Sequence, residues 1–133
     1  MKDTTTKPNK TVSRQPFSIR ARLASFRYAW EGLKEFFAGQ HNAIVHAVAT
    51  LVVIILCFVV KLSTAELLAL TIVTGMVWIA ELLNTAIEKL CDLVSPAFNP
   101  KVKFIKDVAA AAVLVSAVMA VVAALIIFIP KLL

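Results

Sequence analysis

The sequence predicts an all-α integral membrane protein in which three transmembrane helices follow an amphipathic helix at the membrane interface. The first observation is composition: 60% of the 133 residues are apolar, 17% are charged, and the mean hydropathy is +0.86. A soluble domain this short has a high surface-to-volume ratio and would need more polar surface than this sequence supplies. The other two observations are three long apolar stretches and a helical apolar stripe that precedes them.

Residues 1–16 form a basic, polar tail in which four basic residues lie among Thr, Asn and Ser residues. Almost nothing in the tail is apolar, so we expect it to be flexible. It lacks the apolar segment and the cleavage site of a secretory signal, which favours a tail that stays on the cytoplasmic side.

Residues 17–38 predict an interfacial helix, which opens a membrane-embedded domain of residues 17–133. Its apolar residues share one helical face at about 100° per residue: Leu23, Phe26, Trp30, Leu33 and Phe37. The segment has no long uninterrupted apolar run, so we expect it to lie in the interface, with Tyr28 and Trp30 at headgroup depth. A surface helix packed on protein alone has the same periodicity and stays an alternative.

Three apolar stretches predict transmembrane helices at about residues 43–60, 67–94 and 100–130. Their lengths suit a hydrocarbon core that takes ~20 helical residues to cross. Twelve of the fourteen basic residues lie before the first stretch or around the loop between the second and the third. Because basic loops stay in the cytoplasm, we expect three crossings and a cytoplasmic N-terminus. This placement accounts for the net charge of +6 without a nucleic-acid partner.

Four polar residues on the second stretch are the main candidates for a functional site. Glu81, Asn84, Glu88 and Asp92 are spaced three, four and four residues apart, which places them on one helical face about 16 Å long. Acids at membrane depth are costly unless they are paired, solvated or bound to a cation. Their oxygen atoms suit a hard cation such as Mg²⁺. The alternative is ion pairing with nearby lysines that only stabilises helix packing.

Two further groups lie near the same membrane edge. Lys106 and Asp107 precede the apolar part of the third stretch, where a lysine either neutralises phosphate oxygens or extends to the interface. Residues 40–42 and His46 lie where the interfacial helix meets the first stretch. They either line a cytoplasmic cleft or contact lipid headgroups.

These residues resemble the signature of the small bacterial integral-membrane diacylglycerol kinases and undecaprenol kinases. The matching run is Glu81-Leu-Leu-Asn84-Thr85-Ala-Ile-Glu88, then Asp92, then Lys106-Asp107 with an alanine-rich segment after it. Upstream, Tyr28-Ala-Trp30-Glu-Gly32-Leu33 resembles the end of the family's surface helix. The resemblance covers about residues 20–130, which is nearly everything except the tail.

The resemblance implies a kinase that uses ATP and Mg²⁺ to phosphorylate a membrane lipid alcohol, either diacylglycerol or undecaprenol, at the cytoplasmic face of the bacterial inner membrane. It also implies a homotrimer whose active sites lie between neighbouring subunits. By motif position, Glu81 is the general base on the lipid hydroxyl, and Glu88 holds Mg²⁺. The residues implied on the substrate and nucleotide side are Asn84, Asp92, Lys106, Asp107, Gln40 and Tyr28.

The chain departs from the family pattern at one place. Where the family has a glutamate, then Asn and an Arg two residues further on, this chain reads Gln40-His41-Asn42-Ala43-Ile44. Glutamine keeps a carbonyl oxygen but loses a charge, so metal and nucleotide affinity should fall. The alternative function is therefore a catalytically weakened or non-catalytic small membrane oligomer descended from this family. A small multidrug-type transporter accounts poorly for Lys106 and for several acids at one interface.

Overall fold

The computed structural model describes residues 18–133, so the predicted tail of residues 1–16 lies outside the described residues. Every regular element among the described residues is an α-helix, which confirms the predicted all-helical fold. The chain divides into two compact units, one up to Gly32 and one from Leu33 to Leu133. The helices are α1 (Ile19–Gly39), α2 (His41–Val59), α3 (Thr64–Val94) and α4 (Pro100–Leu132).

The first unit contains the larger part of α1, and most of its side chains are exposed. Arg27 forms an ion pair with Glu31 one turn further on, with Nε and Oε1 3.7 Å apart. The Arg27 guanidinium also lies 5.2 Å from the centroid of the Tyr28 ring. Pairs at this spacing stabilise an exposed helix by about 0.2–0.5 kcal/mol. The location of this helix in the membrane interface stays a prediction.

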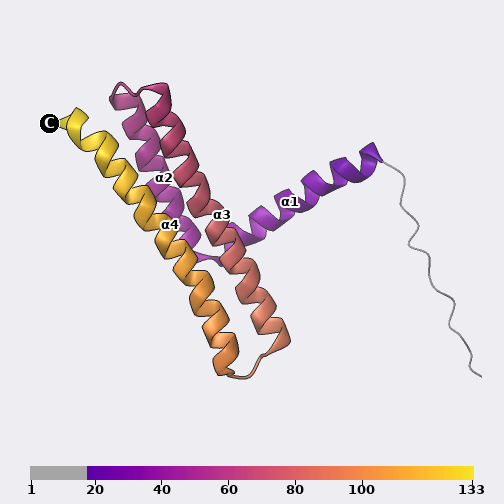
Figure 1. Ribbon diagram of the computed structural model, residues 1–133. Coiled ribbons are helices and arrows are strands. Elements are labelled where there is room, and N and C mark those ends of the chain that lie inside the picture. The colour runs from indigo at the N-terminus through magenta and orange to yellow at the C-terminus, as the bar shows by residue number, and fades with distance from the viewer. Residues whose placement is uncertain (1–17) are drawn as a thin grey trace, which may run out of the picture. The chain divides into compact units, whose positions relative to one another are not determined.

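In the second unit, α2, α3 and α4 lie side by side and alternate in direction (Figure 1). α3 packs on α4 over much of its length and less extensively on α2. The three helices are 19, 31 and 33 residues long and predominantly apolar. Each is therefore long and apolar enough to cross a membrane, which agrees with the predicted fold class.

Side-chain caps determine where α3 and α4 begin. Ser63 Oγ accepts a hydrogen bond from the Glu66 N–H (3.3 Å), and Glu66 Oε2 accepts one from the Ser63 N–H (2.7 Å). This reciprocal capping box begins α3 three residues before the predicted apolar stretch. At the start of α4, Asn99 Oδ1 accepts a hydrogen bond from the Lys101 N–H (2.9 Å), and the following proline opens the helix.

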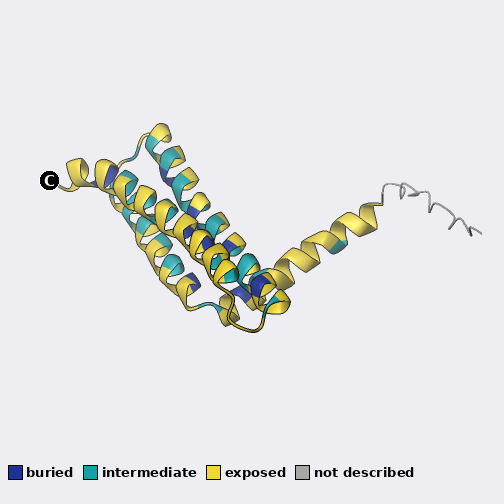
Figure 2. Ribbon diagram, turned by 60° about the horizontal axis from the view of Figure 1, so that its bottom comes forward, coloured by how far each residue is buried: buried dark blue, intermediate teal, exposed yellow. Residues whose placement is uncertain are grey.

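The second unit contains few buried residues. Leu70, Ile127 and Phe128 form a buried cluster where α3 meets the end of α4. Figure 2 shows buried residues scattered along the helix contacts, while exposed positions cover most of the surface. Many large apolar side chains are exposed, with Phe58 at 88%. Such a surface suits lipid chains or other subunits rather than water.

Candidate active site

The acidic face of α3 carries the two polar side chains that are buried in the described part of the chain. Glu81 is 1% exposed and Asn84 is 6% exposed, and they lie one turn apart. Residues 67–80, which precede Glu81 on α3, are mostly apolar and contain no proline, so the helix continues unbroken into the acidic face. A buried carboxylate is costly unless it is paired or chemically used. Glu81 is therefore the strongest candidate for a catalytic group.

Three buried oxygen atoms on α3 have no hydrogen-bond partner among the described residues: Glu81 Oε2, Asn84 Oδ1 and Thr85 Oγ1. Nearly all buried polar atoms in folded proteins have a partner, and exceptions occur where a site takes a ligand or an ion. His46 on α2 faces Glu81, but its Nε2 is 4.0 Å from Glu81 Oε2, which is too long for a direct hydrogen bond. These oxygens are therefore free to accept hydrogen bonds from a ligand or to bind a cation.

Asn84 connects the buried end of the acidic face to Glu88. Its Nδ2 donates a hydrogen bond to Glu88 Oε1 over 3.2 Å. The bond orients the Glu88 carboxylate and leaves Asn84 Oδ1 as an unpaired acceptor. Asn84 lies one turn from Glu81 and Glu88 lies one turn further on, so the three side chains follow one another along the same face of α3.

Two lysines of α4 pair with acids at the same end of the unit. Lys106 Nζ lies 2.5 Å from Asp92 Oδ1, which joins α4 to α3, and Lys106 is about one-third exposed. Lys103 Nζ lies 2.5 Å from Asp107 Oδ2 within α4, and both of these side chains are more than half exposed. The ion-pair alternative therefore describes Asp92 and Asp107. Glu81 instead faces a histidine across α2 and α3.

Gln40 and Tyr28 are the two remaining predicted site residues. Gln40 lies between α1 and α2, half-buried, and its side chain makes no capping hydrogen bond to α2. Tyr28 belongs to the first unit and is exposed. Within residues 18–133, no three His, Cys, Asp or Glu side chains converge as a preformed metal site. A metal at Glu88 would therefore take most of its ligands from water, from the substrate or from another subunit.

A polar connection between α2 and α3 was not predicted from the sequence. The Trp78 indole N–H donates to Thr50 Oγ1 (3.1 Å), and the Thr50 hydroxyl donates to the backbone carbonyl of His46 (2.7 Å). The Trp78 ring also packs edge-on against the His46 ring, with centroids 6.3 Å apart, and against Phe36 at the same distance. The sequence contains one signal for this connection, which is the position of its polar residues along the two helices. Thr50 follows His46 by one turn, and Trp78 precedes Glu81 by three residues.

The Thr50 connection gives a testable prediction. Thr50→Val keeps the shape of the side chain but leaves the Trp78 N–H without its acceptor, so we expect it to lower the free energy of unfolding in detergent by about 1–2 kcal/mol. Thr71→Val is the matched control, because the Thr71 hydroxyl bonds only to the carbonyl of Leu67 in its own helix (2.8 Å). Equal stabilities of the two variants would contradict a role for Thr50 in joining the helices.

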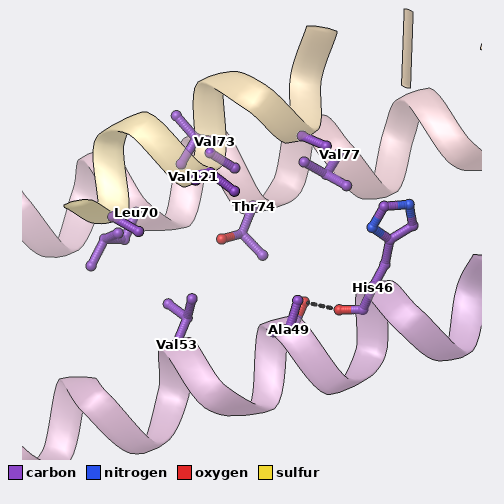
Figure 3. Close-up of a pocket in the computed structure, with 12 residues that line it drawn as sticks. His46, Ala49, Val53, Leu70, Val73, Thr74, Val77 and Val121 are labelled. Carbon is purple, nitrogen blue, oxygen red and sulfur yellow. Dashed lines mark hydrogen bonds between the residues drawn. The ribbon is translucent and has the colours of Figure 1, made fainter. Parts of the chain in front are cut away.

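An apolar cavity of about 130 Å³ lies between α2, α3 and α4. Figure 3 shows His46 and Val77 at one end of it and Val53 and Leu70 at the other, with Thr74 between them. Alanines 117, 120 and 124 contribute its α4 side. Small residues on α4 leave this space open, and His46 is the one ionisable group that lines it.

The chain is similar in sequence to known proteins over most of its length. Residues 27–128 match the family described as prokaryotic diacylglycerol kinase. The chain is 41% identical over 108 residues to an undecaprenol kinase of Bacillus subtilis (strain 168), and this alignment covers 81% of the chain and 88% of the relative. It is 38% identical over 112 residues to a diacylglycerol kinase of Synechocystis sp. (strain ATCC 27184 / PCC 6803 / Kazusa), covering 84% of the chain and 64% of that relative.

The matched region contains the whole acidic face of α3, Lys103 and Lys106 of α4 and the junction at Gln40. The family match extends over most of the chain, and both relatives are aligned over more than four-fifths of it. The resemblance recognised in the motif of α3 is thereby confirmed, and this chain belongs to the prokaryotic diacylglycerol kinase family.

Proposed function

We propose that this lipid kinase transfers the γ-phosphate of ATP to the hydroxyl group of a membrane lipid alcohol at the cytoplasmic face of the bacterial inner membrane. The observation that carries the proposal is the Glu81 carboxylate, which is 1% exposed and has an oxygen without a hydrogen-bond partner in the described chain. A general base needs a free oxygen within reach of the proton that it takes. A lipid hydroxyl that arrives laterally in the membrane would meet the Glu81 carboxylate where water is scarce.

The chemistry assigns one role to each end of the acidic face. Glu81 takes the proton of the lipid hydroxyl, the hydroxyl oxygen bonds to the γ-phosphorus, and the bond to the bridging oxygen breaks with its electron pair leaving on ADP. Asn84 holds Glu88 and keeps an oxygen free toward the site. Lys106, held by Asp92, supplies positive charge for the phosphate oxygens.

The donor set fits Mg²⁺. Glu88 and the free Asn84 Oδ1 are hard oxygen ligands, and Mg²⁺ is usually held by one or two carboxylates together with waters and substrate phosphates. When bound, the ion would neutralise charge on the β- and γ-phosphates of ATP. We therefore assign Glu88 to the metal, and we assign Gln40, Asp107 and Tyr28 to the nucleotide side.

The proposed topology places the N-terminus and the Lys106 end of the helices in the cytoplasm. The arrangement supports it, because Lys61 and Lys131 meet at the opposite end, where Lys131 pairs with Glu66 (3.2 Å) and donates to the Lys61 carbonyl (3.0 Å). We also propose a homotrimer with active sites between subunits. The extensive exposed apolar surface of α2–α4 supports contacts with other subunits as well as with lipid.

Undecaprenol is the proposed substrate in preference to diacylglycerol. The undecaprenol kinase relative is covered over 88% of its length, against 64% for the diacylglycerol kinase relative.

The test is transfer of labelled γ-phosphate by purified protein in mixed micelles that contain both lipid alcohols at equal mole fraction. We expect labelled undecaprenyl phosphate as the main product, and none after Mg²⁺ is chelated. Labelled phosphatidate as the main product would overturn the substrate assignment, and transfer without any divalent cation would overturn the metal assignment.

The departure at Gln40 gives a second prediction. Gln40→Glu adds an anionic oxygen ligand at the junction of α1 and α2, so we expect the Mg²⁺ concentration for half-maximal activity to fall about tenfold. His41→Glu, one residue further along, adds the same charge on an exposed position and is the control. Equal Mg²⁺ requirements of Gln40→Glu and the unmodified protein would contradict a place for residue 40 beside the proposed Mg²⁺–ATP complex.

A further inference from the structure

We propose that His46 is a positioning residue that holds the Glu81 carboxylate ready to take the lipid hydroxyl proton, a role that rests on the proposed function. His46 lies on α2 and Glu81 on α3, and their side chains are 16% and 2% exposed. The His46 Nε2 and Glu81 Oε2 atoms are 4.0 Å apart. A side-chain movement of about 1 Å would bring them to hydrogen-bonding distance.

The Trp78 side chain of α3 contacts the part of α2 that carries His46. The His46 backbone carbonyl accepts the Thr50 hydroxyl (2.7 Å), and Thr50 accepts the Trp78 indole N–H (3.1 Å). The Trp78 ring lies edge-on to the imidazole at 6.3 Å between centroids. Because Trp78 is on the same helix as Glu81, these contacts fix the register between the His46 ring and the carboxylate.

Among the described residues around Glu81, His46 is the one placed to stabilise the negative charge of its carboxylate. Burial disfavours an ionised carboxylate, and Glu88, two turns along the same face of α3, carries a charge of the same sign. α4 contributes the alanines 109 and 112 beside Asn84 rather than a cation, while Lys106 is engaged by Asp92. Asn84 directs its amide N–H toward Glu88. His46 is thus the group that the structure places in position to donate a hydrogen bond to Glu81 Oε2.

A donor at this position would act on the chemical step alone. It would favour the ionised form of Glu81, which is the form that can take a proton, and it would fix which oxygen faces the substrate. His46 touches neither the transferred phosphate nor the lipid oxygen in this scheme, so substrate binding should be unaffected. The cavity of about 130 Å³ that His46 lines is apolar, which keeps the interaction in a medium of low polarity.

The test compares His46→Leu, His46→Gln and His41→Leu in the full chain, with kcat and both KM values measured in micelles. We expect His46→Leu to lower kcat about 10- to 100-fold with the KM values for ATP and lipid unchanged. His46→Gln retains an N–H donor and should recover most of the lost kcat. His41 is exposed at the start of the same helix, so His41→Leu should behave as the unmodified protein.

Three results would overturn the role of His46. Equal losses of kcat in His46→Leu and His46→Gln would mean that the packing of the side chain matters and its donor does not. A fall in the thermal stability of His46→Leu with kcat retained would mean the same. A rise in KM with kcat unchanged would place His46 in substrate binding. If the unmodified protein phosphorylates no lipid alcohol, the proposed function fails as well, whereas an active protein that is indifferent to His46→Leu removes this inference alone.

Discussion

Glu81→Gln is expected to lower kcat for phosphate transfer by about 10³-fold, because the amide has no basic oxygen to take the lipid hydroxyl proton. The fold should survive the change. A buried carboxylate with an unpaired oxygen is costly to bury, so a neutral side chain of the same shape should leave the stability equal or raise it. The measurement is kcat under saturating substrates, together with thermal unfolding and oligomer size in detergent.

The matched control for this prediction is Glu66→Gln. Glu66 lies on the same helix, fifteen residues before Glu81, where it caps α3 and pairs with Lys131. Glutamine keeps an oxygen that can accept the Ser63 N–H and loses only the ion pair with Lys131, so this substitution should change stability little and leave kcat intact. The opposite pattern, in which Glu81→Gln retains transfer but weakens the oligomer, would assign Glu81 to subunit packing and favour the non-catalytic alternative.

Lys106→Met is expected to lower kcat/KM for ATP by about 10²-fold, because it removes the positive charge that we propose stabilises the phosphate oxygens of ATP. The aliphatic length of the side chain is kept, so packing along α3 and α4 should change little. Binding of ATP can be followed separately by titration of the purified protein in micelles.

Lys103→Met provides the comparison for Lys106. Both lysines belong to the first turns of α4 and both pair with an aspartate at 2.5 Å, but the Lys103 pair is within one helix and more exposed. We expect Lys103→Met to change kcat/KM for ATP less than threefold, as is usual for an exposed pair. Equal effects of the two substitutions would mean that Lys106 only anchors the helix at the membrane surface.

The helical fold and the acidic face of α3 were predictable because both depend on local periodicity. A run of apolar residues long enough to cross a membrane specifies a helix, since lipid cannot satisfy an unpaired backbone. Spacings of three and four residues then place Glu81, Asn84 and Glu88 on one side of that helix whatever surrounds it. The motif on the same residues also identified the family.

The partners of these residues were not predictable, because they depend on the register between helices. Nothing local indicates that His46, thirty-five residues before Glu81, faces its carboxylate, or that Trp78 reaches Thr50. The sequence offered several lysines as ion-pair partners for the acids, and only the packing of α3 on α4 selects Asp92 for Lys106. α3 begins three residues before the predicted apolar stretch, because the capping box formed by Ser63 and Glu66 precedes that stretch.

The most direct test of the central claim is transfer of labelled phosphate from ATP to undecaprenol by the unmodified protein and by Glu81→Gln, prepared and reconstituted in parallel. We predict Mg²⁺-dependent formation of undecaprenyl phosphate by the unmodified protein and its loss in Glu81→Gln, with both proteins folded and of the same oligomer size. Undiminished transfer by Glu81→Gln, or no transfer to any lipid alcohol by folded unmodified protein, would contradict the account.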